Sequence, residues 1–139
     1  MSGIIVNNVA RASGTIAATP GGLDWSTAVV TASTVTVEAG RGYFINTTSN
    51  ACTVTLPSSA EAGDQIVIAD YARTWSTNAV TLDSNGLNFQ GQADTYTVDY
   101  DTVGQSLNIV YSDSTKGWLP VSDDAVAFDN VNTAPTQKD

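Results

Sequence analysis

Short runs in which apolar residues alternate with threonine or serine recur along this 139-residue chain. The clearest lie within residues 26–38 and at Cys52–Leu56. A two-residue alternation places one set of side chains on each face of a β-strand. No stretch carries the sustained 3.6-residue apolar spacing of an amphipathic helix. The chain is therefore predicted to be all-β.

Turn residues divide the chain into short expected strands. Residues 43–47 and 52–56 read as a hairpin, as do 79–82 and 87–90. The second pair is joined through Asn85-Gly86, because both of these residues tolerate positive φ. The other expected strands are 26–38, 65–69, 96–100, 107–111 and 118–121. Their number and spacing predict a compact antiparallel β-sandwich or small barrel with extended N- and C-terminal arms.

The length fits one domain, which we place at residues 26–121. An N-terminal extended arm is expected at 1–25 and an acidic C-terminal tail at 122–139. Trp118 is expected in the core, and the single Cys52 is expected as a buried free thiol. The core is further predicted from alternate strand positions: Val35, Val37, Phe44, Val54, Leu56, Ile66, Ile68, Val80, Leu82, Val98, Ile109 and Tyr111.

Charge and residue usage argue against several functional classes. The net charge is -9, and the five cations, Arg11, Arg41, Arg73, Lys116 and Lys138, form no patch. Phosphate backbones and anionic membranes both require clustered Lys and Arg, so neither is an expected partner. The chain has no histidine and one cysteine, which removes histidine-based triads and His or Cys metal sites. We expect no enzyme activity, no catalytic residue and no cofactor.

Two carboxylate pairs, Asp99 with Asp101 and Asp123 with Asp124, have the oxygen ligands that a hard cation prefers. Their spacing matches no known calcium loop, and solvated surface carboxylates are the simpler interpretation. We therefore predict no metal site.

Four residues are the candidates for an interface or binding site. Tyr71 and Trp75 lie in a polar loop, where they either cap one end of the core, contact another subunit or stack on a glycan. Arg73, in the same loop, is either an isolated surface cation or one half of an ion pair across an interface. Trp25 lies where the arm meets the body and is an expected anchor for the arm.

An ordered series of short motifs runs through the middle of the chain. It comprises Gly42-Tyr-Phe-Ile-Asn-Thr-Thr-Ser49, Thr53-Val-Thr-Leu-Pro57, Ala62-Gly-Asp64, Asp70-Tyr-Ala72, Thr77-Asn-Ala-Val-Thr81, and Tyr111 through Gly117-Trp-Leu119. Over roughly residues 40 to 121, this series resembles a β module of tailed-bacteriophage virion proteins. That family includes capsid decoration proteins and head or tail fibres. The Gly-Asp after the Leu-Pro loop and the Gly-Trp near the end are the most specific parts.

The resemblance implies a homotrimeric, non-enzymatic module on the outside of a phage particle. Because only a short arm and a short tail flank the module here, we expect a capsid decoration (cement) protein that stabilises the head. Its partners would be copies of itself and the major capsid protein or other virion proteins. The alternative is a short head or tail fibre or adhesin that binds host glycans. Since Met1–Val6 lacks the features of a signal peptide, the protein is expected in the virion, assembled in the host cytoplasm.

Overall fold

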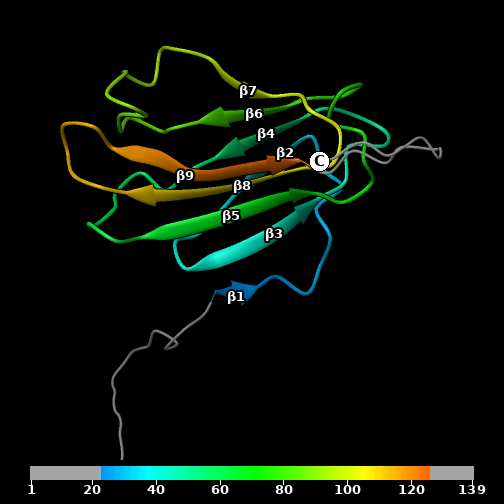
Figure 1. The fold of residues 1–139 in the computed structure, drawn as a ribbon, viewed down its shortest axis with the longest axis horizontal. Coiled ribbons are helices and arrows are strands. Elements are labelled where there is room, and N and C mark those ends of the chain that lie inside the picture. The colour runs from blue at the N-terminus through cyan, green and yellow to red at the C-terminus, as the bar shows by residue number, and fades with distance from the viewer. Residues whose placement is uncertain (1–22, 126–139) are drawn as a thin grey trace, which may run out of the picture.

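Two β-sheets packed face to face make up the computed structural model, which describes residues 23–125 (Figure 1). Within that range there are nine strands and no helix. The five-stranded sheet has the order β1-β3-β5-β8-β9, and the four-stranded sheet has the order β2-β4-β6-β7. The strands are β1 (Asp24–Trp25), β2 (Thr34–Thr36), β3 (Arg41–Ile45), β4 (Cys52–Thr55), β5 (Gln65–Asp70), β6 (Val80–Asp83), β7 (Val98–Tyr100), β8 (Gln105–Tyr111) and β9 (Trp118–Ala125).

The first six strands alternate between the two sheets. Odd-numbered strands β1, β3 and β5 lie side by side in parallel, and so do even-numbered strands β2, β4 and β6. Each pair of successive strands therefore forms one coil, and three coils stack as in a β-solenoid. The chain then reverses, because β7 pairs antiparallel with β6, β8 with β5, and β9 with β8.

The predicted antiparallel arrangement of the sandwich is wrong. Four of the seven strand pairings are parallel, and both sheets are mixed. Side-chain alternation reports that one face of a strand is buried, but it carries no information about the direction of the neighbouring strand. Parallel neighbours need a long connection, which is commonly a helix. Here a strand in the opposite sheet provides it.

Neither predicted hairpin forms. Strands β3 and β4 lie in different sheets, so the connection between them is a corner of the coil. Asn85 and Gly86 do adopt positive φ, of 57° and 90°, and Leu87 N–H donates a hydrogen bond to Ser84 O at 3.1 Å. The antiparallel partner of β6, however, is β7. The expected strand 87–90 is reduced to isolated bridges at Phe89.

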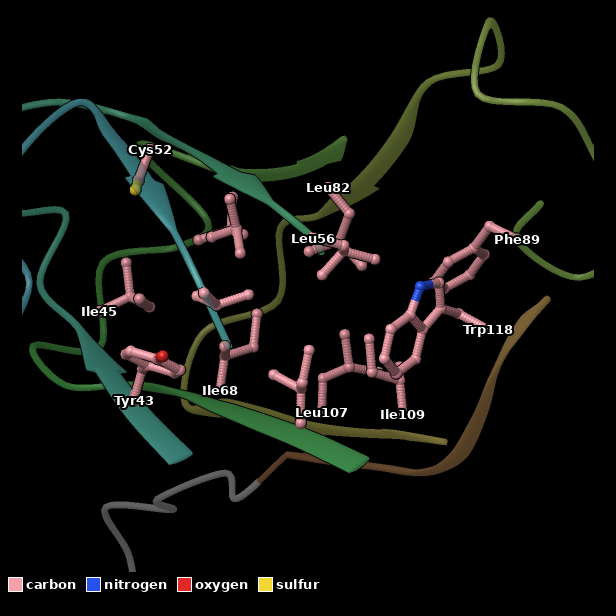
Figure 2. Packing of buried hydrophobic residues seen from close by; sticks show 14 of the residues in the cluster. Tyr43, Ile45, Cys52, Leu56, Ile68, Leu82, Phe89, Leu107, Ile109 and Trp118 are labelled. Atoms are coloured by element: carbon pink, nitrogen blue, oxygen red, sulfur yellow. The ribbon is translucent and has the colours of Figure 1, made fainter. Parts of the chain in front are cut away.

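The core lies between the two sheets, as Figure 2 shows for Ile68, Leu82 and Leu107. Most predicted core residues are buried, and Val35 and Val98 pack against the core from its margin. Trp118 and Cys52 are buried as predicted. The placement of Phe44 in the core is wrong, because its neighbours Tyr43 and Ile45 point inward and Phe44 is 39% exposed on the outer face.

Neither predicted domain boundary separates a strand-free arm or tail from the sandwich. Trp25 belongs to β1, and β9 continues beyond Val121 to Ala125. The remainder of the predicted arm and tail lies outside the described residues.

Candidate interaction surface

Trp25 lies flat on the outer face of the five-stranded sheet, between β1 and β3. It is paired in register with Gly42, and a Cβ built at Gly42 would lie 2.6 Å from two atoms of the Trp25 indole. Only glycine leaves room for this packing. The indole also stacks on Phe44, with ring centroids 4.9 Å apart and an interplanar angle of 22°. Both rings remain about two-fifths exposed.

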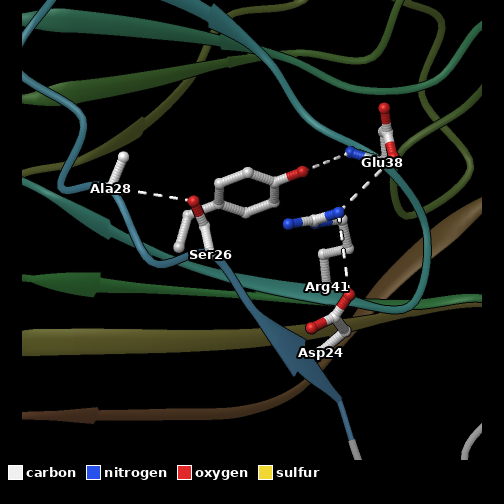
Figure 3. Close-up of polar contacts among 6 residues, drawn as sticks. Asp24, Ser26, Ala28, Glu38 and Arg41 are labelled. Atoms are coloured by element: carbon white, nitrogen blue, oxygen red, sulfur yellow. Dashed lines mark hydrogen bonds and ion pairs between the residues drawn. The ribbon is translucent and has the colours of Figure 1, made fainter.

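Polar contacts hold the start of β1 beside the start of β3 (Figure 3). Arg41 Nη1 lies 3.7 Å from Asp24 Oδ2 and 4.0 Å from Glu38 Oε1. Glu38 N–H donates to the Tyr43 hydroxyl at 2.8 Å, and burial raises the pKa of Tyr43. The carboxylates are largely exposed, so each ion pair is worth only about 0–1 kcal/mol. The position of β1 is set by its backbone hydrogen bonds to β3, from Asp24 N–H to Gly40 O and from Ser26 N–H to Gly42 O at 2.9 Å each, and these place Trp25 over Gly42.

Tyr71 extends this outer surface beyond the end of β5. Its N–H donates to Ile45 O at 3.1 Å, which continues the β3–β5 ladder by one residue. Tyr71 directly follows β5, in which Ala69 is the register partner of Phe44. Its side chain is 56% exposed. We call the surface formed by Trp25, Phe44 and Tyr71 the aromatic face.

Trp75, four residues further on, is fully buried. Its indole N–H donates to Ile45 O at 3.4 Å, so the side chain closes one end of the core. Asp70 holds the loop in place, since its carboxylate accepts hydrogen bonds from the backbone N–H groups of Thr74, Trp75 and Gly104 at 2.9–3.1 Å. Of the alternatives for this residue, the core cap is what the geometry shows. The buried indole offers no surface for stacking on a glycan.

Arg73 lies between these two aromatics in the same loop. It is half-buried, it adopts a φ of 58°, and it takes part in an interaction with another group. The structure therefore brings Tyr71, Arg73 and Trp75 together in one loop, but gives them different environments. Of the four candidate residues, Trp25 and Tyr71 belong to the aromatic face.

One carboxylate of each predicted pair accepts a hydrogen bond within the chain. Asp99 accepts from the Thr81 hydroxyl at 2.7 Å, and Asp123 accepts from the Gln105 side chain. Among the described residues, no group of three or more His, Cys, Asp or Glu side chains is placed to hold a metal ion.

Sequence reasoning missed Gly42, Phe44 and Asp70. A glycine inside a strand often marks the close approach of another group, so Gly42 carried a usable signal. Phe44 did not, because the run Tyr43-Phe44-Ile45 is apolar on both faces.

Comparison with protein-family models finds no match, and a search of curated proteins also finds none. Residues 23–125 contain no helix that is long and apolar enough to cross a membrane.

Proposed function

We propose that the chain is a non-enzymatic structural protein of a tailed-phage virion, and that it decorates the capsid as an oligomer and stabilises the head. The motif series over roughly residues 40 to 121 supports the virion assignment by resemblance. The aromatic face is the observation that supports assembly. Clustered exposed aromatic rings are enriched at protein interfaces, where they bury large apolar area at low entropic cost.

The flat arrangement of the aromatic face suits contact with another protein. Trp25 is held by its stacking on Phe44 and by its seat over Gly42, so little side-chain freedom remains to be lost on binding. Aromatic residues fixed in this way are typical anchors of interfaces. Many such contacts repeated over a capsid add up to strong attachment even if each copy binds weakly.

The test is the mass of the purified chain by light scattering, alone and after co-sedimentation with heads of the parent phage. We expect an oligomer that sediments with heads and raises the temperature at which they release DNA. A Trp25→Ala/Phe44→Ala variant should lose assembly or attachment by tenfold or more. Tyr96→Ala is the matched control, because Tyr96 is 61% exposed in the loop before β7 and lies outside the aromatic face.

A monomer that ignores heads would overturn the decoration proposal. An oligomer that ignores heads, but adsorbs to host cells, would support the fibre or adhesin alternative. Attachment that survives loss of both rings would keep the decoration role and remove the aromatic face from it.

A further inference from the structure

The one Asn-Gly dipeptide of the chain, Asn85-Gly86, lies in the turn that follows β6 (Figure 1). An asparagine before glycine is prone to spontaneous deamidation, because glycine has no side chain to hinder attack by its own backbone nitrogen. The Gly86 nitrogen bonds to the side-chain carbonyl carbon of Asn85, whose bond to Nδ2 breaks. The proton lost from the Gly86 nitrogen leaves with Nδ2 as ammonia, and a succinimide ring remains. Water then opens the ring to give aspartate or isoaspartate.

Asp94 occupies the backbone group that would carry out this attack. Gly86 N–H donates to Asp94 Oδ2 at 2.7 Å, across the connection between β6 and β7. The reactive form of a backbone amide is its deprotonated anion. A carboxylate that accepts the N–H opposes the loss of that proton, because the anion would form beside an existing negative charge. Gly86 is exposed to solvent, so this hydrogen bond, and not burial, limits its reactivity.

The departing group is held as well. The half-buried Asn85 side chain donates from Nδ2 to Leu56 O at 3.0 Å, directly after β4. Because Nδ2 is the atom that leaves as ammonia, the reaction has to give up this bond. The aspartate that results carries only acceptor oxygens and cannot donate to Leu56 O. The bond from the turn to the neighbouring coil is therefore lost in the product.

We propose that Asn85 is a deamidation site that the native fold keeps closed through Asp94, and that its conversion to aspartate or isoaspartate weakens the fold. The site opens when the turn detaches from Asp94 in a local opening of the β6–β7 connection. The modification therefore records how often this connection opens over the lifetime of the protein. The proposal is independent of the proposed function.

The test follows deamidation of Asn85 in the full chain at mildly alkaline pH, by peptide mapping with mass spectrometry. We expect Asp94→Ala to raise the rate on the order of tenfold, because it removes a hydrogen bond to a charged group. Asp99→Ala is the matched control, since Asp99 is also an exposed carboxylate but accepts from the Thr81 hydroxyl. Wild-type chain unfolded in urea gives the unprotected rate, which should exceed that of the folded chain.

A rate in Asp94→Ala equal to that in Asp99→Ala would overturn the proposal. Folded wild-type chain that deamidates as fast as the unfolded chain would overturn it too. Trp75→Ala tests whether lower overall stability is a sufficient explanation, because Trp75 is a buried residue of a different loop. Acceleration in Trp75→Ala that matches Asp94→Ala would assign the protection to the whole fold and remove Asp94 from it.

Asn85→Asp reproduces the aspartate product and tests its effect on the fold. Its urea denaturation midpoint should lie below that of the wild-type chain, since Leu56 O loses its donor. The control is Asn50→Asp, which adds the same charge where Nδ2 donates to the adjacent Ala51 O at 3.1 Å. An Asn85→Asp midpoint no lower than that of Asn50→Asp would overturn the proposed weakening. Neither experiment bears on capsid attachment, which is measured with the aromatic-face variants.

Discussion

At the scale of single residues, Tyr71 and Trp75 show how one loop separates exposed from buried aromatics. Trp75 is fully buried against the end of the core, while Tyr71 is 56% exposed. The difference comes from Asp70, whose carboxylate binds the N–H groups of Thr74 and Trp75 and turns the chain inward at that point. This loop therefore stabilises the fold chiefly by burying Trp75.

Replacing Trp75 with alanine should lower the free energy of unfolding by about 3–5 kcal/mol, because it leaves a large cavity at the end of the core. Urea denaturation followed by circular dichroism would measure the change. Trp25→Ala serves as the comparison, since Trp25 is 40% exposed and should cost clearly less. Equal losses for the two variants would show that Trp75 is not the core cap described above.

At the scale of elements, the β8–β9 hairpin is held by a close approach of two loops. Gly117 precedes β9 with a φ of 70°, and a Cβ there would lie 1.8 Å from Asn88 O. The Trp118 N–H donates to the same carbonyl at 3.0 Å. Both the backbone conformation and the space therefore require glycine, which gives a physical reason for the Gly-Trp motif.

Gly117→Ala should destabilise the protein by more than the cost of left-handed backbone alone. Gly86→Ala is the matched control, because Gly86 has a φ of 90° but nothing within 4 Å of a built Cβ. That control should lose about 1–2 kcal/mol. The two unfolding free energies are compared by urea titration. A Gly117→Ala variant as stable as Gly86→Ala would mean that the Asn88 loop moves aside without cost.

At the scale of the whole molecule, the two sheets also meet electrostatically. Tyr100 on β7 is in the four-stranded sheet, and Asp123 on β9 is in the five-stranded sheet. Burial, and to a lesser degree the charge of Asp123, raises the pKa of Tyr100 from 10.0 to about 12. The folded protein therefore keeps this phenol protonated at pH values where the unfolded chain has released the proton.

The raised pKa of Tyr100 makes the stability of the fold depend on pH in the alkaline range. Between pH 10 and about 12 the unfolded state binds fewer protons than the folded state, so stability falls as pH rises through this window. Below pH 10 the contribution is fully present. Unfolding free energies measured from pH 9 to 12 should show this decline, and Tyr100→Phe should reduce its slope. An unchanged slope in that variant would assign the decline to other groups.

Much of the local structure was predictable, because it depends on neighbouring residues in the chain. Alternation located most of the strands and the buried residues within them, and the Asn85-Gly86 turn has the predicted positive φ. The burial of Cys52 and Trp118 followed from their strand-like surroundings. The aromatic face was only partly predictable, since Trp25 and Tyr71 were candidates and Phe44 was assigned to the core.

The sequence by itself determined that this chain forms short β-strands and which side chains most of them bury, because a two-residue period is a local property. Only the tertiary structure decided which strands become neighbours. The chain passes to the opposite sheet after each of its first five strands, so partners lie a full coil apart and no short-range signal marks them. The parallel pairing, the outward turn of Phe44 and its stacking with Trp25 all follow from that long-range choice.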